Sequence, residues 1–295
     1  MTKHIIYVIS IPLFLFVSCN SEADAIVVEE TIINVEVEEG QNYEPKNLVV
    51  YSIPSPNEQM NLFYNSNAKF DPSLILPLSN FSRYSTDAKK ALNFGVLMSD
   101  GAYLTRFSQS KGRWMDYHTT LKNLGKDIGI TESFEGNLKN NIEELANDSN
   151  KLFEVSSQYY LSIYDELIEK QRGVELSFIL SGAWIETMHI LLTSANKYDE
   201  NSEIQTHIVD QRFVLENLMG ILGDYKDNLQ LNDLLKQFDE ICQVYLKLNC
   251  ENFDLEIENR EELLILNGGS TCTFDSDSFK EMKSLVKQIR TSIIS

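Results

Sequence analysis

The strongest constraint on the fold is the spacing of apolar residues after residue 84. They recur every three or four positions, which is the period of an amphipathic α-helix and not of a β-strand. The connections between the periodic stretches are short, and short connections favour antiparallel neighbours. The sequence therefore predicts a mostly all-α fold, an antiparallel multi-helix bundle. The expected helices span residues 57–64, 85–109, 112–130, 131–147, 148–173, 174–198, 202–225, 228–249 and 276–294.

Polar residues that cap helix N-termini mark several of these boundaries. The 85–109 helix is expected to start at Ser85 or Thr86. The 148–173 helix is expected to start at Asp148, and the last helix at Ser276 or Asp277. Such side chains accept hydrogen bonds from the backbone N–H groups that the first helical turn leaves unpaired.

The stretch 174–198 is apolar nearly all the way round, so we expect it at the centre of the bundle. We take Gly173 as the stop of the helix before it. After the N-terminus, this stretch is the part of the chain that comes closest to a membrane span. Glu186 and His189 interrupt it, however, so a buried helix explains the pattern better.

Residues 252–274 are the exception to the helical pattern. The runs DLEIE, ELLIL and STCTF are short and rich in β-forming residues. Asn-Gly-Gly at 267–269 is a strong signal for a hairpin turn. We therefore expect a small β-hairpin element near 252–274, beside the bundle.

The first 18 residues have the features of a secretory signal peptide. Lys3 and His4 supply a short positive start, and the apolar run that follows is too short to span a bilayer comfortably. The run ends at Phe16-Val17-Ser18-Cys19, which resembles a bacterial lipobox with Phe in place of the usual Leu. We expect cleavage before Cys19 and lipid attachment to its thiol, which would anchor the chain to a membrane. The alternative is an ordinary cleaved signal with a coincidental cysteine.

Residues 19–50 are expected to form an acidic tether between this anchor and a helical domain at 51–295. Residues 20–50 carry eight acidic side chains and one lysine. Such a segment stays solvated and is repelled by anionic lipid, so it would hold the domain away from the bilayer. Residues 51–84 have little periodicity beyond the helix at 57–64, and we expect them to lie over the bundle surface.

The net charge and the expected location limit the classes of partner that the chain could bind. The formal net charge of −19 argues against nucleic acid, because phosphate recognition needs clustered Lys and Arg. A lipid on Cys19 would place the chain in the bacterial cell envelope, anchored to the outer membrane. Glu22 and Asp24 resemble a thin version of the acidic surface-export signal of Bacteroidota lipoproteins. The surface and periplasmic faces of that membrane both remain open.

Three cysteines follow the proposed lipid site: Cys242, Cys250 and Cys272. An oxidising envelope favours one disulfide. Cys242 and Cys250 would be about 12 Å apart on one helix, which is too far for a disulfide. Cys250 with Cys272 is therefore the expected pair. Three unpaired, buried cysteines fit the sequence equally well.

Two short motifs resemble a family of uncharacterised helical lipoproteins of Bacteroidota. They are Gly-Val-x-x-x-Asp-x-x-Tyr at 95–103 and Gly-x-Trp-x-Glu at 182–186. The resemblance covers most of the chain after the tether. It implies a helical fold and an envelope location, and it implies no mechanism, because the family has no established activity.

Asp100 and Glu186 are the candidate polar site, because each lies in an apolar helix where a charge is costly unless it is paired. Asp100 shares a helix face with Tyr103, and Glu186 shares one with His189, since both pairs are spaced i, i+3. If the two helices pack together, one pocket would hold all four side chains. A buried hydrogen-bonded network that fixes helix register is the favoured interpretation of this cluster.

Gly95 and Gly182 lie on the same two helices as these polar residues. A glycine has no Cβ, so the backbone of a neighbouring helix can approach it closely. We therefore expect the two helices to meet at these glycines.

Metal binding is the competing interpretation of the same residues. Glu-x-x-His at 186–189 has the spacing used by di-iron bundles, but the sequence has no second Glu-x-x-His, so a di-iron site is disfavoured. A single metal ion could be held by His189, Glu186 and Asp100, with His118 as a further ligand, although no complete motif supports it. The sequence names no cofactor.

We therefore expect a lipid-anchored envelope domain that binds a small ligand or a protein partner in a groove between helices, without enzymatic activity. Trp114 and Trp184 could line such a site, although aromatic residues at helical spacing are usually part of the core. The alternative is a metal-binding or enzymatic bundle that uses Glu186, His189 and Asp100. A third hypothesis, a structural role in an envelope complex, requires an exposed apolar patch.

Overall fold

The computed structural model describes residues 53–79, 84–107, 111–134, 148–195, 202–260 and 263–295. The expected signal peptide, Cys19 and the expected acidic tether lie outside the described residues, as does most of the helix expected at 131–147. The chain divides into two units, Met1–Asn47 and Leu48–Ser295, and the described residues belong to the second unit. Its helices and strands are α1 (Pro56–Asn65), α2 (Asp87–Arg106), α3 (Lys111–Asp127), the 3-10 turn η3 (Glu132–Phe134), α5 (Ser149–Glu169), α6 (Gly173–Ser194), α7 (Glu203–Asp224), α8 (Leu229–Tyr245), β1 (Asn249–Arg260), β2 (Leu263–Thr273) and α9 (Ser276–Ile294).

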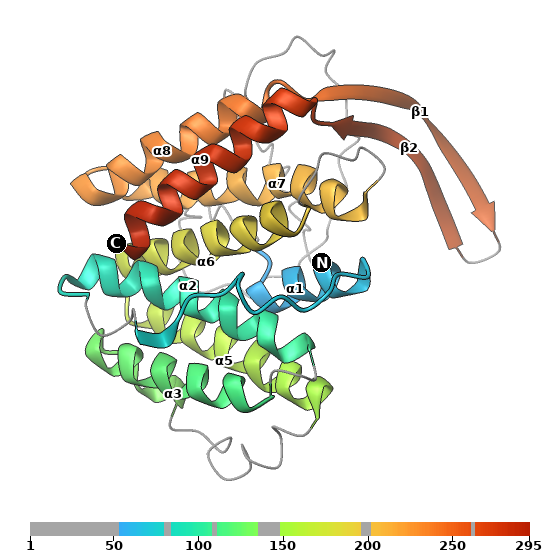
Figure 1. Cartoon of the computed structure of the whole chain (residues 1–295). Helices are drawn as coiled ribbons and strands as arrows, with labels where there is room; N and C mark the ends of the chain where they lie inside the picture. Colours follow the sequence, from blue (N-terminus) through green and yellow to red (C-terminus); the bar gives the residue numbers. More distant parts are fainter. Residues whose placement is uncertain (1–52, 80–83, 108–110, 135–147, 196–201, 261–262) are drawn as a thin grey trace, which may run out of the picture. The chain divides into compact units, whose positions relative to one another are not determined.

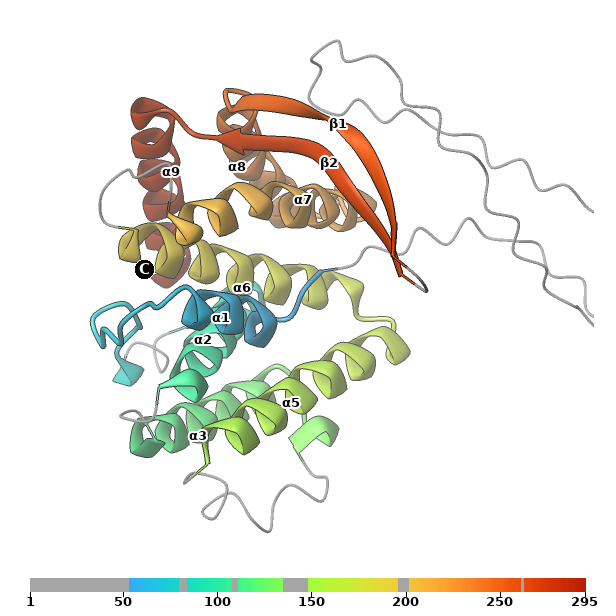
Figure 2. The same cartoon turned by 90° about the vertical axis from the view of Figure 1, so that its right-hand side faces the viewer.

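This unit is a helical bundle with one small β-hairpin, as the apolar periodicity predicts (Figure 1). α2 and α6 lie at its centre and make the most extensive contact between any two described helices. α3 and α5 pack on α2, whereas α7 and α9 pack on α6, and α8 contacts both α7 and α9. The short helix α1 contacts both central helices (Figure 2).

The central position of α6 explains its composition. By length and composition alone it could cross a membrane, with a mean hydropathy of 1.3 over its most apolar stretch, but 89% of that stretch is buried inside the bundle. A helix covered on every side by other helices has no polar face to present. α6 is therefore the core helix that its sequence predicts.

Helix caps agree with the sequence at two of three expected positions. Thr86 caps α2 and Asp148 caps α5, each by accepting hydrogen bonds from backbone N–H groups of the first turn. At the last helix the expectation of Ser276 or Asp277 is wrong by one position. Asp275 accepts those hydrogen bonds instead, so α9 begins at Ser276.

The junction between α5 and α6 also differs from expectation. α5 ends at Glu169, Gln171 adopts a left-handed φ of 56°, and Gly173 is the first residue of α6. A Cβ on Gly173 would lie 1.8 Å from the Tyr225 hydroxyl. This glycine therefore permits close packing between α6 and the end of α7, rather than ending a helix.

Part of the segment before α2 belongs to the core. Met60 and Phe63 of α1 are fully buried, and Leu74, Ile75 and Leu76 are at most 6% exposed. The expectation that residues 51–84 lie over the bundle surface is wrong for these residues. The helix expected at 57–64 is confirmed as α1, but the irregular segment after it has no apolar period that would indicate which of its residues are buried.

The β-element is one long hairpin and not three short strands (Figures 1 and 2). β1 and β2 pair antiparallel and join through residues 261–262, which lie outside the described residues. Asn-Gly-Gly at 267–269 is therefore not the turn. Asn267 pairs with Glu256 and Gly269 pairs with Phe253, and the register shifts between these two pairs. Glycine inside a strand often marks such a bulge.

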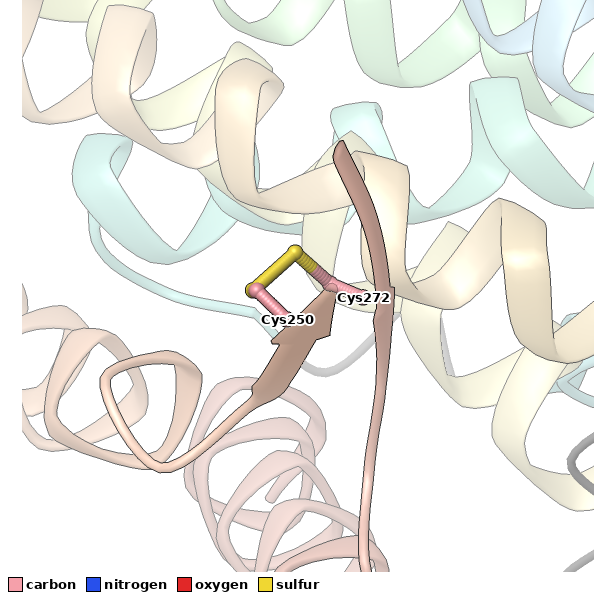
Figure 3. Close-up of a disulfide and its surroundings, with 2 residues drawn as sticks. All are labelled: Cys250 and Cys272. Atoms are coloured by element: carbon pink, nitrogen blue, oxygen red, sulfur yellow. A yellow bond between two sulfur atoms is a disulfide. The ribbon is translucent and has the colours of Figure 1, made fainter. Parts of the chain in front are cut away.

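A disulfide joins the two strands near the helices (Figure 3). Cys250 lies opposite Cys272 in the hairpin register, and their Cα atoms are 4.1 Å apart. The bond ties the end of the hairpin that leads from α8 to the end that leads into α9. Cys242, on α8, stays a thiol.

Candidate functional site

The contact between α2 and α6 depends on two glycines that face each other's backbone. A Cβ on Gly95 would lie 1.9 Å from the Ile179 carbonyl oxygen, and a Cβ on Gly182 would lie 1.9 Å from the Leu92 carbonyl oxygen. Only glycine fits at such distances, so the expected close approach is confirmed. The same interface carries the acidic residues of the candidate site.

Glu186 is fully buried and pairs with a residue that the sequence did not single out, Arg290 of α9. Arg290 Nε donates to Glu186 Oε2 at 2.6 Å, and a terminal Arg290 nitrogen donates to Oε1 at 2.7 Å. Burial disfavours the charged guanidinium, but the hydrogen bonds and charge of Glu186 outweigh it and raise the pKa of Arg290. The pair is a bidentate buried ion pair, which is the strong geometry for Arg and carboxylate.

The sequence did contain a signal for Arg290. In α9 the buried residues Val286, Ile289 and Ile293 form one apolar stripe, and Arg290 lies within it at helical spacing. An arginine inside a buried stripe needs an acidic partner. Glu186 is an acid inside an apolar helix, so it needs a basic partner in the same way.

Asp100 lies near this pair and is also fully buried. Its Oδ2 accepts a hydrogen bond from the Leu76 N–H at 3.0 Å, whereas its Oδ1 accepts none from the described residues. Burial, together with the negative charge of Glu186, raises the pKa of Asp100 well above its ordinary value. A proton on Oδ1 fits both observations, because a neutral carboxyl can donate toward Glu186.

Tyr103 and His189 point to other partners. The Tyr103 hydroxyl accepts a hydrogen bond from the Asp71 N–H at 2.7 Å. His189 Nδ1 lies 3.4 Å from the Thr193 hydroxyl, and the ring also hydrogen-bonds the Leu74 backbone. Burial, and then the positive charge of Arg290, lower the pKa of His189 to about 3. The four candidate side chains therefore do not converge on one pocket.

Three of the four candidate side chains bind the backbone of one segment, residues 71–76. Tyr103 binds its start, His189 its middle and Asp100 its end. Tyr117 of α3, which the sequence reasoning missed, donates to the carbonyl oxygen of Leu76. The network therefore attaches an irregular segment to the core. A buried hydrogen-bonded network was expected here, but these contacts hold a backbone segment rather than the register of two helices.

The arrangement offers little to a metal ion. Both oxygens of Glu186 are engaged by Arg290. Across the described parts of the chain, no group of three or more His, Cys, Asp and Glu side chains is placed to hold a metal. His118, the further ligand considered from the sequence, lies in a different part of the bundle and lines the cavity described next.

A cavity of about 30 Å³ lies between α1, α2, α3 and α5, and we refer to it as the first cavity. Its walls include four aromatic side chains from α3 and α5: Trp114, Tyr117, Tyr159 and Tyr160. The Trp114 ring stacks on His118, with ring centroids 5.2 Å apart and planes inclined by 21°. The residues that the structure describes in its lining include none of the four candidate side chains, Asp100, Tyr103, Glu186 and His189.

Two buried polar atoms of the first cavity have no hydrogen-bond partner among the described residues. They are Nδ2 of Asn57, which is 2% exposed, and Nε2 of His118, which is 9% exposed. Ser156 donates to the other amide atom, Asn57 Oδ1, at 3.2 Å. Burial, and then the positive charge of Lys122, lower the pKa of His118 to about 4, so its ring is neutral at pH 7.

A second cavity of about 20 Å³ lies on the other side of α1, against α6 and α7, and Tyr160 lines both cavities. Trp184 Nε1 and Gln211 Oε1 line it and are also buried without a partner among the described residues. The Gln211 amide nitrogen donates to Gln59 Oε1 at 2.5 Å. Both tryptophans of the chain therefore line a cavity beside α1.

The chain matches no protein-family model, no curated protein and no solved structure. A functional assignment therefore depends on the residues and their geometry.

Proposed function

We propose that this chain is a lipid-anchored domain of the bacterial cell envelope that binds a small ligand without converting it. The first cavity carries the proposal. Buried polar atoms are nearly always hydrogen-bonded, and leaving one unpaired costs about 1–3 kcal/mol. Two such atoms beside aromatic walls are the expected composition of a small-molecule site, in which a few polar groups orient the ligand.

The bonding of the two buried acidic residues gives neither of them a catalytic task. Glu186 is held by Arg290, and Asp100 is attached to the Leu76 backbone. A general base must reach a substrate proton, and a metal ligand needs a free lone pair. Both acids instead stabilise the packing of α2, α6 and α9. The lipid anchor is supported by the lipobox-like sequence that ends at Cys19.

A ligand screen on the full chain in detergent tests the proposal. Neutral and charged small molecules are added one at a time, and the melting temperature and ligand NMR signals are measured. We expect a compound that raises the melting temperature and is recovered unchanged. Its effect should vanish in Gly101→Leu, which fills the first cavity, and persist in Gly223→Leu, a helical glycine outside it.

Two results would contradict the proposal. One is a screen in which no compound shifts the melting temperature or contacts the protein. The other is a compound that is chemically altered by the wild-type chain and not by Gly101→Leu, which would make the site catalytic.

A further inference from the structure

We propose that the first cavity is a site for a neutral, planar carboxamide group carried by a small molecule. This inference rests on the proposed function and goes further by naming the ligand class. It is drawn from four properties of the cavity: the absence of charge, the two unpaired polar atoms, the flat walls and the small volume.

The lining of the first cavity carries no charge. Among the described residues that line it, none is Asp, Glu, Lys or Arg, although the chain has 44 acidic and 25 basic residues. His118 does not supply a charge either, because burial keeps its ring neutral at pH 7. A charged group entering the cavity would lose its hydration without gaining a counter-charge from the described lining residues, because Lys122 acts on His118 from outside that lining. The ligand group is therefore neutral.

The two unpaired atoms fit the two sides of an amide. Because Ser156 donates to Asn57 Oδ1, the free atom of that amide is the donor Nδ2, which requires an acceptor such as a carbonyl oxygen. Nε2 of a neutral His118 can accept a hydrogen bond when the ring proton is on the other nitrogen. A carboxamide offers a carbonyl acceptor and an N–H donor in one plane, so it can satisfy both atoms.

The walls and the volume favour a small, flat group. Trp114 and His118 are stacked nearly parallel and present a planar surface. Since a water molecule needs about 10–15 Å³, a cavity of about 30 Å³ holds a group of only a few heavy atoms. A Cβ built on Gly101, which lines the cavity, would meet no atom within 4 Å. The absent side chain leaves room for the remainder of the ligand at that wall.

Three benzene derivatives that differ in one substituent separate the effect of charge from the effect of hydrogen bonding. Benzamide has the neutral carboxamide, benzoate replaces it with a charge, and toluene removes the polar group. The measurement is the dissociation constant for the full chain in detergent, reported by Trp114 fluorescence in a Trp184→Phe background. The chain has two tryptophans, and Trp184 does not line the first cavity, so this change leaves one reporter at the site.

Benzamide should bind more tightly than benzoate and toluene, each by at least about tenfold. Benzoate buries an unpaired charge, and toluene leaves Asn57 and His118 unpaired. Asn57→Leu and His118→Phe should each weaken benzamide by about tenfold. Gly101→Leu should abolish binding while Gly223→Leu does not. If a leucine variant fails to fold, the pair Gly101→Ala and Gly223→Ala makes the same comparison with a single methyl group.

The outcomes also separate this inference from the proposed function. Equal binding of benzamide and benzoate, or benzamide binding that survives in both glycine variants, overturns the carboxamide site. A charged or wholly apolar compound that binds the cavity and loses affinity in Gly101→Leu overturns the inference but leaves small-ligand binding intact. If no compound perturbs Trp114 or the melting temperature, both proposals fail.

Discussion

Glu186 and Arg290 are each buried in a place where an unpaired charge would be costly. Arg290 is only 13% exposed and Glu186 is fully buried. We expect Glu186→Gln to lower the free energy of unfolding by about 3–5 kcal/mol, because it leaves the guanidinium buried without its counter-charge. Chemical denaturation with urea measures this change directly.

A double variant provides the control for this pair. In Glu186→Gln/Arg290→Met the buried charge is removed together with its partner, so the loss of stability should be smaller than in Glu186→Gln alone. If the loss of stability in the double variant equals the sum of the losses in Glu186→Gln and in Arg290→Met, the ion pair does not couple these two positions.

Divalent metals test the alternative use of the same glutamate. We expect chelator and added Zn²⁺, Mn²⁺ or Ca²⁺ to leave the melting temperature of the wild-type chain unchanged, because Arg290 already engages both Glu186 oxygens. A metal-dependent rise that disappears in Glu186→Gln would instead support the metal-binding hypothesis.

His118 makes the stability depend on pH. Its pKa is about 4 in the folded chain and about 6.5 when unfolded, so between these values only the unfolded chain binds a proton. Stability from this group is present above pH 6.5 and is lost as the pH falls. From pH 7 to pH 5 we expect a loss of about 2 kcal/mol from His118. Denaturation at both pH values should show a smaller loss in His118→Phe, and equal losses in the two chains would contradict the assignment.

At the level of single residues, the sequence predicts which polar groups are buried better than it predicts their partners. Asp100 and Glu186 stand out because they interrupt apolar helices, and both are fully buried. Periodicity assigns a residue to a face of its own helix, but it does not say which other helix covers that face. Arg290 interrupts an apolar stripe of its own helix, which signals a buried charge, but its pairing with Glu186, over 100 positions earlier in the chain, is seen only in the fold.

The contact between α2 and α6 is the most extensive contact between two described helices, so a change within it should strongly destabilise the bundle. A Cβ at Gly95 or Gly182 would overlap a carbonyl oxygen of the other helix, and backbone atoms cannot rotate away as a side chain can. We expect Gly95→Ala and Gly182→Ala each to lower the free energy of unfolding by more than about 3 kcal/mol. Equilibrium denaturation monitored by circular dichroism measures the effect.

Gly101→Ala is the matched control on the same helix. Its Cβ would meet nothing within 4 Å, so the change removes the low helix propensity of glycine without a clash. We expect this variant to be more stable than the wild type by about 0.5–1 kcal/mol. Equal effects at Gly95 and Gly101 would show that helix propensity, and not the helix contact, governs both sites.

At the level of elements, the described helices were predictable, including the short one at 57–64, whereas the hairpin turn and the irregular segment before α2 were not. The central position of the 174–198 stretch followed from its composition, and the meeting of two helices at Gly95 and Gly182 followed from the absence of their side chains. The hairpin turn was misplaced because Asn-Gly-Gly favours a turn locally, whereas the pairing of the whole strands put these residues at a bulge. The burial of Leu74, Ile75 and Leu76 was missed because their segment is held by side chains from other elements.

For the whole molecule, the sequence predicts that one unit attaches the chain to a membrane and that the other unit binds the ligand. The unit Leu48–Ser295 contains the bundle and both cavities, and the unit Met1–Asn47 contains Cys19 and most of the residues expected to form the signal peptide and the acidic tether. If lipid on Cys19 supplies the membrane affinity, binding in the first cavity and attachment to the membrane should be separable properties.

Cys19→Ser tests that separation in cells. We expect that the variant no longer incorporates a labelled fatty acid. It should also be absent from the membrane fraction that detergent solubilises, because the acyl chains supply the membrane affinity. Cys242→Ser, which removes the thiol on α8, should keep both the label and the membrane location. The melting temperature of Cys19→Ser should equal that of the wild type, since Cys19 belongs to the other unit. Unchanged fatty-acid labelling in Cys19→Ser would show that this cysteine is not the lipid site and would favour an ordinary cleaved signal.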